Sequence, residues 1–145
     1  SALKWACYRV VRLYLRFVSP IAFLARRFIL TASMTHPPLF GGGICLDIGA
    51  GTAPYRELIE SRFRLKKYIC LDLAPSDHDT VIGDAMDIPF QDNSFTLVVS
   101  FDVIQHVSSP EVALDEMARV VAPGGYVLLT FPFLYPECDA HDFGI

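Results

Sequence analysis

The segment Ile44–Pro54 reads ICLDIGAGTAP and combines three features that are typical of a ligand-binding turn. An apolar run contains an acid, Asp47, near its end, which is the pattern of a buried parallel strand. Gly49 and Gly51 follow, and glycine allows backbone conformations and close approaches that a Cβ would block. The closing proline suits the first position of a helix, which we predict over residues 55–61. A strand, a glycine turn and a helix N-terminus together predict a site for an anionic group.

The spacing of the glycines distinguishes two classes of nucleotide-binding site. The dinucleotide fingerprint G-x-G-x-x-G requires a third glycine where this chain has Pro54. An acid-x-Gly-x-Gly pattern, formed by Asp47, Gly49 and Gly51, fits the sequence better. An NAD(P)-binding oxidoreductase is therefore a weaker alternative. A plain tight turn without a ligand is another alternative, because two glycines after a strand are common.

The composition of the chain is that of one globular domain with an unevenly charged N-terminal part. The 145 residues are 52% hydrophobic and 19% charged, with a formal net charge of −4. Residues 1–35 contain six basic residues and no acid, whereas residues 36–145 contain the other six basic residues and all 16 acidic ones. We therefore predict a basic extension at 1–35, a linker at 36–43 and an acidic domain at 44–145. The net charge gives no argument for a nucleic-acid partner, and none is expected.

The basic extension is predicted to form two helices. Apolar residues recur at helical spacing between Leu3 and Phe17, with arginines on another face, and a second helix is expected from Ser19 to Ser33. Two interpretations stay open: the helices pack on the domain over the ligand site, or they lie on a membrane surface. No uncharged apolar run in the extension reaches the roughly 18 residues of a membrane-spanning helix.

The four cysteines, Cys7, Cys45, Cys70 and Cys138, show neither a C-x-x-C motif nor metal-ligand spacing. Cys45 and Cys70 each precede an acid at a predicted strand end by two residues, which predicts reduced thiols that face the core side by side. We expect no metal site. Nothing requires an oxidising compartment, so we expect a cytoplasmic location, at the inner face of the membrane if the extension binds there.

Four more strands are predicted after the glycine turn. Their ranges are 67–72, 81–85, 94–101 and 126–131, with a short helix beginning within 102–107 and a longer one over 110–121. Asp72 and Asp84 stand near the ends of two of these strands, as Asp47 does in the first. Because ligands of an open parallel sheet bind outside the carboxyl ends of the strands, we expect the three acids around one site.

The ordered motifs of residues 44–135 resemble the class I S-adenosyl-L-methionine (SAM) dependent methyltransferases, specifically the type 11 methyltransferase domain. The motifs are LDIGAG at 46–51, LDL at 71–73, GDA and IPF at 83–90, DNSF at 92–95, VIQHV at 103–107 and RVVAPGG at 119–125. The resemblance implies an α/β, Rossmann-like, doubly wound and mainly parallel sheet. It also implies SAM as cofactor, S-adenosylhomocysteine as product, and methyl transfer to a small-molecule or lipid- or saccharide-linked acceptor. A SAM-fold protein that does not catalyse is the alternative.

The same resemblance implies four groups of cofactor-binding residues. They are Asp47, Gly49, Ala50 and Gly51 for the methionine part of SAM; Asp72, followed by Leu73, for the ribose hydroxyls; Asp84 and the backbone of Ala85 for the adenine amino group; and Ser100 and Phe101 for the sulfonium and its methyl. A carboxylate is suited to accept both ribose hydroxyls.

Methyl transfer needs a general base only when the acceptor must lose a proton, since the protein mainly positions the reactants. The candidate bases are Asp102, His106, Tyr135, His141 and Asp142. Two positions depart from the family pattern. Thr96 stands where an acid is usual, which we interpret as structural, and Gln105 replaces the glutamate that usually precedes the histidine. His106 therefore has two possible roles: a general base, or a structural helix residue that makes only a local hydrogen bond.

The resemblance also implies a C-terminally incomplete domain. Class I methyltransferases continue past the fifth strand with a helix and two strands, whereas only 14 residues follow Phe131 here. An uncovered strand edge is an aggregation hazard, so a longer chain, a second copy in a homo-oligomer or the basic extension is expected to cover it. We expect these 145 residues to bind SAM without the substrate-binding portion.

Overall fold

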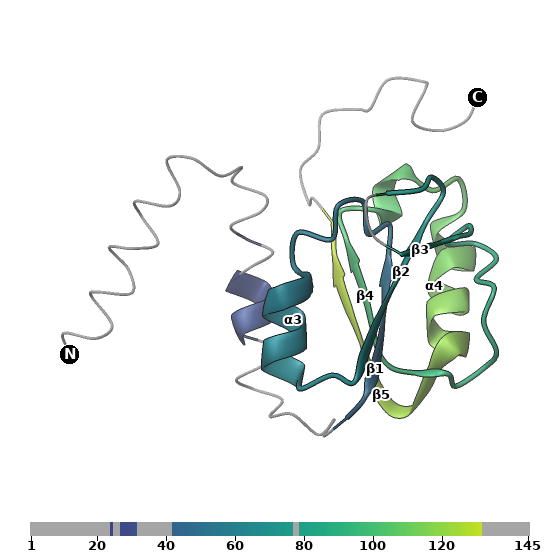
Figure 1. The fold of residues 1–145 in the computed structure, drawn as a ribbon. Helices are drawn as coiled ribbons and strands as arrows, with labels where there is room; N and C mark the ends of the chain where they lie inside the picture. Colours follow the sequence, from purple (N-terminus) through teal and green to yellow (C-terminus); the bar gives the residue numbers. More distant parts are fainter. Residues whose placement is uncertain (1–23, 25–26, 32–41, 77–78, 132–145) are drawn as a thin grey trace, which may run out of the picture.

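The fold was analysed in a computed structural model of the chain (Figure 1). The structure describes residues 24, 27–31, 42–76 and 79–131. The first predicted helix of the basic extension and most of the linker lie outside the described residues. The candidate bases Tyr135, His141 and Asp142 lie outside them as well.

Five parallel strands form the centre of the described domain. They are β1 (Ile44–Ile48), β2 (Lys67–Asp72), β3 (Thr80–Ile82), β4 (Phe95–Phe101) and β5 (Val121–Thr130). Their order across the sheet is β3-β2-β1-β4-β5, and every neighbouring pair is parallel. The order reverses at β1, so the space beyond the carboxyl ends of the central strands is the expected ligand position.

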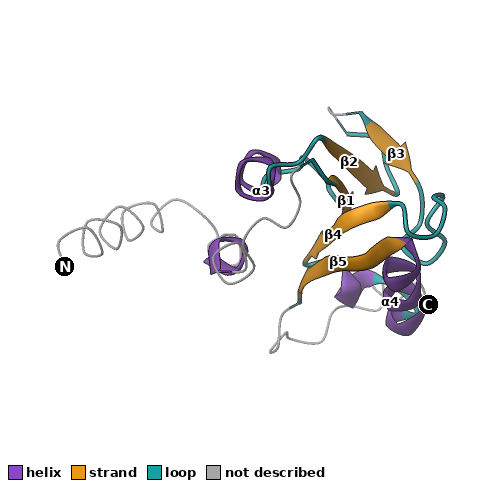
Figure 2. Cartoon of the chain, turned by 90° about the horizontal axis from the view of Figure 1, so that it is seen from below, coloured by secondary structure: helices purple, strands orange, loops and turns teal. Residues whose placement is uncertain are grey.

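Helices cover both faces of the sheet (Figure 2). Helix α3 (Arg56–Phe63) lies on one face, and α4 (Pro110–Val120) lies on the other together with the short 3₁₀ helix η1 (Ile104–His106). Residues 27–31 are also helical and lie beside α3, where Ile29 is buried in the same apolar cluster as Ile59. This arrangement confirms the Rossmann-like α/β fold.

The alternation of side chains along β1 divides the core into two clusters. Cys45 packs on the α3 side with Cys70, whereas Leu46 and Ile48 pack on the α4 side with Met117. Burial on both faces explains why the strands read as continuous apolar runs. Both cysteines are buried and free, as predicted.

Two predicted boundaries around the glycine turn and the third strand are wrong. Helix α3 begins at Arg56, one residue after the predicted start at residue 55, because the Arg56 N–H closes a turn onto the Ala53 carbonyl (3.1 Å). The third strand ends at Ile82, because Asp84 leaves the parallel ladder and forms an isolated antiparallel bridge. In both cases a local turn replaces the regular element that the pattern suggested.

The last strand also begins earlier than predicted. Strand β5 starts at Val121, which pairs with Phe95, so the Pro-Gly-Gly sequence lies inside the strand rather than before it. The pairing register shifts between Phe95 and Leu97, and this irregularity accommodates the proline and the glycines at the start of the strand.

Thr96 explains one departure from the family pattern. Its Oγ1 accepts a hydrogen bond from the Ile44 N–H (2.9 Å) and donates one to the Ile44 carbonyl (3.1 Å). Both backbone groups at the start of β1 are therefore satisfied by this hydroxyl. The contact agrees with the structural interpretation of Thr96.

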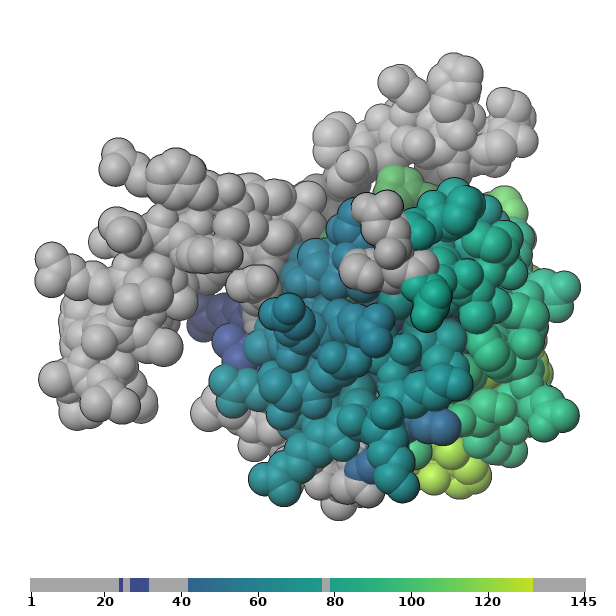
Figure 3. All heavy atoms as spheres, in the orientation of Figure 1, coloured from purple at the N-terminus to yellow at the C-terminus, as the bar shows by residue number. Residues whose placement is uncertain are grey.

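The described residues pack into one continuous body in the space-filling view (Figure 3), from the α3 region in teal to the segment after β3 in green. Within this part of the chain, none of the helices has the length and apolarity needed to cross a bilayer. Strand β5 forms one edge of the described sheet; Val127 on this strand and Phe131 directly after it are exposed.

Candidate active site

A shallow cleft with a volume of about 90 Å³ opens at the carboxyl ends of β1 and β2. It is lined by Ile48, Gly49, Leu71, Asp72, Leu73, Gly83, Asp84, Ala85, Val103 and Val107. The cleft therefore brings together five of the ten predicted cofactor residues, from three separate segments of the chain. These five are Gly49, Asp72, Leu73, Asp84 and Ala85.

Asp72 connects the end of β2 to the glycine turn. Its Oδ2 accepts the N–H of Gly51 (2.8 Å), and its Oδ1 accepts the N–H of Ala74 (3.4 Å). A carboxylate has about four acceptor positions, so Asp72 retains capacity for two hydroxyl donors. The side chain thus fixes the turn and presents the acceptors that a ribose diol requires.

Gly49 brings the backbone close to the loop after β4. Its φ is +67°, and a Cβ built there would overlap Cγ2 of Val103. The Gly49 N–H also donates to the Leu71 carbonyl (2.8 Å), which extends the β1–β2 pairing into the turn. Glycine is required here both for its conformation and for the space that it leaves.

The loop between β3 and β4, residues 83–94, forms the second wall of the cleft and is called here the β3–β4 loop. The Gly83 N–H donates to the Asp72 carbonyl (3.0 Å), and Asp84 Oδ1 accepts the Met86 N–H (2.9 Å). Ala85 is buried between these contacts. The loop therefore presents Asp84 and Ala85 opposite Asp72.

Asp47 does not line the cleft. Its side chain is 3% exposed and lies on the α3 side of the sheet, where its Oδ2 accepts the Tyr68 hydroxyl (2.5 Å). Burial raises the pKa of Asp47 to about 7; the Tyr68 hydrogen bond opposes this shift and the nearby Asp72 adds to it. Burial also raises the pKa of Tyr68, so Tyr68 remains a neutral donor.

Four other predicted cofactor residues lie outside the cleft lining. Ala50 is buried in the α3-side cluster, and Phe101 packs edge-on against Tyr55 with ring centroids 5.1 Å apart. The side chain of Ser100 is fully buried, and its Oγ has no hydrogen-bond partner among the described residues. Gly51 is exposed and contributes its N–H to Asp72.

The described candidate bases lie beyond the end of β4. Asp102 has a φ of +58°, and its N–H donates to the Thr130 carbonyl (3.1 Å). Gln105 Nε2 donates to the Asp102 carbonyl (2.9 Å) and lies 3.3 Å from Nε2 of the exposed His106. His106 is thus near a local amide, and its use as a base stays a prediction. No cluster among the described residues has the side chains to hold a metal ion.

Sequence reasoning missed the apolar half of the cleft. Val103 and Val107 come from the loop and turn around η1, and Ile48, Leu71 and Gly83 complete the lining. The VIQHV motif contains both valines, but the prediction from this motif concerned only His106 as a candidate base. The sequence alone does not distinguish an apolar strand-end residue that lines a ligand site from one that packs in the core.

Comparisons with known proteins agree with this geometry. A model of the methyltransferase domain family, type 11, matches residues 46–129. The malonyl-[acyl-carrier protein] O-methyltransferase of Marinomonas sp. (strain MWYL1) is 33% identical over 118 residues, which cover 72% of this chain and 44% of that protein. The tRNA (carboxymethyluridine(34)-5-O)-methyltransferase of Arabidopsis thaliana is 30% identical over 96 residues, covering 61% and 24% of the two chains.

Solved structures share the fold. The trans-methyltransferase CalH, solved in complex with S-adenosylhomocysteine, matches with a TM-score of 0.58 and 19% identity over 83% of this chain and 38% of that one. The present chain thus spans less than half the length of these relatives. The matched family model and the parallel sheet together show that the chain belongs to the class I SAM-dependent methyltransferases, in the type 11 methyltransferase domain family.

Proposed function

We propose that this chain binds SAM in the cleft and provides the cofactor half of a methyltransferase. One observation carries the proposal: Asp72 lines the cleft, and it is bonded to the glycine turn through its side chain and to the β3–β4 loop through its carbonyl. The volume of about 90 Å³ is small beside the roughly 300–1,000 Å³ of complete ligand pockets. The cleft is therefore a shallow part of a larger site, and the proposal assigns the nucleoside of SAM to it.

In this proposal each cleft residue has a binding task. Asp72 accepts the ribose hydroxyls, Asp84 and the backbone of Ala85 hold the adenine amino group, and Leu73 covers the base. Val103 and Val107 exclude water from the same wall. SAM supplies the electrophilic methyl group when it is bound, so the chain's main contribution is orientation.

The acceptor is proposed to be a small molecule or a lipid- or saccharide-linked group. The similarity to an enzyme that methylates malonyl-[acyl-carrier protein] supports a carrier-linked acceptor. The similarity to a tRNA methyltransferase covers a smaller part of this chain, and the net charge of −4 does not favour RNA. A domain that binds SAM without catalysing is the alternative.

Asp72→Ala should weaken the binding of S-adenosylhomocysteine by roughly 1.5–3 kcal/mol, the range for hydrogen bonds to a charged group. Calorimetry on the purified chain measures this change. Asp72→Asn should weaken this binding less than Asp72→Ala does, because the amide oxygen can still accept the Gly51 N–H and one ribose hydroxyl. Asp115→Asn, an exposed acid on α4, serves as control and should bind as the unsubstituted chain does. If the unsubstituted chain binds NAD but neither SAM nor its product at millimolar concentration, the proposal is wrong.

We further propose that the basic extension contacts an anionic membrane surface, which would place a cytoplasmic protein at the inner face of the membrane. The six basic residues of 1–35 support this, as do the exposed side chains of Leu24 and Phe28, which are one helical turn apart. Cosedimentation at low salt should recover more protein with anionic than with neutral vesicles. Equal recovery from both would contradict the proposal.

The domain boundaries at 36–43 and a homo-oligomer that covers β5 stay predictions.

A further inference from the structure

The β3–β4 loop has little regular structure of its own. Strand β3 has three residues, and the loop contains only the isolated bridge between Asp84 and Asp87. Its position therefore depends on the contacts that it makes with the rest of the domain. Ile88 anchors it in the α4-side core, and Phe90 packs edge-on against Phe95 with centroids 5.0 Å apart.

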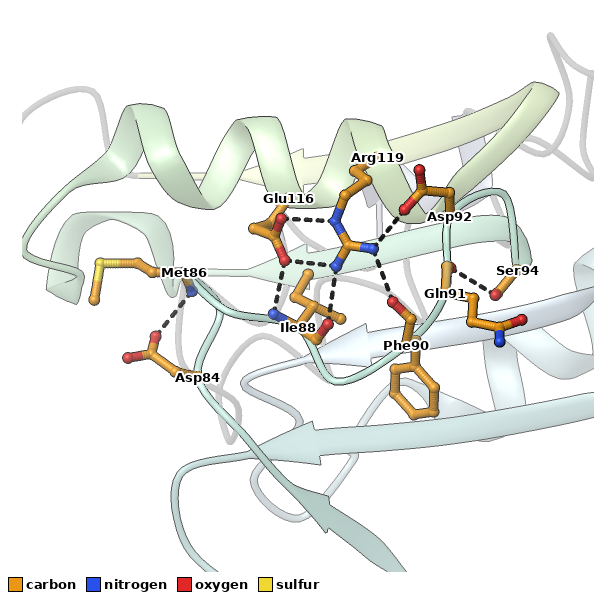
Figure 4. Close-up of polar contacts among 9 residues, drawn as sticks. All are labelled: Asp84, Met86, Ile88, Phe90, Gln91, Asp92, Ser94, Glu116 and Arg119. Atoms are coloured by element: carbon orange, nitrogen blue, oxygen red, sulfur yellow. Dashed lines mark hydrogen bonds and ion pairs between the residues drawn. The ribbon is translucent and has the colours of Figure 1, made fainter.

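Arg119, near the end of α4, makes most of the remaining contacts (Figure 4). Its guanidinium donates to the carbonyls of Ile88 (2.9 Å) and Phe90 (2.8 Å) and to Asp92 Oδ1 (2.8 Å). It also donates two hydrogen bonds to Glu116, both at 2.7 Å. The five N–H donors of an arginine are thus all used.

Glu116 completes the contact from the other side. Its Oε2 accepts the Ile88 N–H (2.8 Å), so the Glu116–Arg119 pair holds both backbone groups of Ile88. The hydrogen bonds from Arg119 hold the pKa of Glu116 below its usual range. The Asn93 N–H adds a bond to the Arg119 carbonyl (3.0 Å).

We propose that Arg119 is a positioning residue for cofactor binding: through Ile88 and Phe90 it fixes the β3–β4 loop so that Asp84 and Ala85 recognise the adenine. Ile88 lies three residues after Ala85, and both Asp84 and Ala85 line the cleft. This inference rests on the proposed SAM site. Arg119 itself is not among the residues that line the cleft.

A lysine cannot replace Arg119 in this arrangement. Its ammonium has three donors on one nitrogen, whereas the contacts here require a planar group that reaches two carbonyls and two carboxylates. Removing Asp92 is the matched control, because its side chain is 68% exposed and contacts Arg119 without holding the backbone of Ile88 or Phe90. Asp92→Asn therefore changes the surface ion pair alone.

The test compares Arg119→Met, Arg119→Lys and Asp92→Asn with the unsubstituted chain by calorimetry. The probes are S-adenosylhomocysteine and S-inosylhomocysteine, which carries a carbonyl in place of the adenine amino group. We expect Arg119→Met to bind S-adenosylhomocysteine about 10- to 100-fold more weakly, Arg119→Lys to fall between, and Asp92→Asn to stay within about twofold.

The ratio of the two affinities separates positioning from a general loss of stability. In Arg119→Met, the ratio of the affinity for S-adenosylhomocysteine to the affinity for S-inosylhomocysteine should fall at least about fivefold. Both affinities are measured at a temperature where circular dichroism shows each variant to be folded. Equal weakening of both ligands, or no weakening in Arg119→Met, overturns the inference and leaves the proposed function intact. If the unsubstituted chain does not bind S-adenosylhomocysteine, the proposed function fails and the inference fails with it.

Discussion

Between pH 5 and pH 8, the unsubstituted chain should lose about 2.5 kcal/mol more of its free energy of unfolding than the Asp47→Asn variant does. The folded-state pKa of Asp47 is raised from 3.8 to about 7, chiefly by burial. Between these two values the folded protein holds a proton that the unfolded chain has released. The stability from the neutral carboxyl is fully present below about pH 4 and is lost as the pH rises to 7. Asparagine cannot ionise, so the variant lacks this loss.

Urea unfolding of both proteins at pH 5, 6, 7 and 8 measures the difference. The comparison between pH values cancels the fixed cost of burying an amide, which is present at every pH. Tyr68→Phe provides a second check. It removes the hydroxyl that lowers the pKa of Asp47, so the loss of stability should extend above pH 7. A difference between Asp47→Asn and the unsubstituted chain that stays constant from pH 5 to pH 8 would contradict this assignment.

Gly49→Ala should destabilise the fold by about 2–4 kcal/mol and abolish cofactor binding at micromolar concentrations. A Cβ at this position overlaps Val103, and the φ of +67° is unfavourable for alanine. Relief of the overlap requires the glycine turn or the Val103 loop to move, and both line the cleft. Chemical unfolding and calorimetry with S-adenosylhomocysteine measure the two effects.

Gly51→Ala is the matched control for the steric part of this effect. Gly51 also has a positive φ, +51°, but a Cβ there meets no atom within 4 Å. Its substitution should therefore cost only about 1–2 kcal/mol, from the backbone conformation. Val103→Ala should also recover part of the stability of Gly49→Ala, because the two side chains share the same space. Equal costs at Gly49 and Gly51 would show that Val103 does not restrict the turn.

The sequence determined the fold class because its signals are local. Buried parallel strands read as short apolar runs, and β2 lies where its run predicts, at Lys67–Asp72. The order of the motifs around the glycine turn identified the family, and it located Gly49, Asp72, Leu73, Asp84 and Ala85 in one cleft. Short apolar runs bounded by glycine, proline and acidic residues suffice for this, since the central strands β1 and β4 are buried along most of their length.

Only the tertiary structure decided which strand-end acid lies inside the sheet and which lies at its carboxyl edge. Asp47 and Asp72 both stand at the ends of apolar runs, but Asp47 is bonded to Tyr68 on the α3 side, whereas Asp72 lines the cleft. The reason is the pairing register: Asp47 pairs with Cys70 and so lies inside the sheet, whereas Asp72 lies two residues further along the same face, at the carboxyl end of β2. The sequence alone does not determine this register. The contacts of Arg119 with Ile88 and Phe90 span about 30 residues of chain, and long-range hydrogen bonds to backbone carbonyls leave no pattern in the sequence.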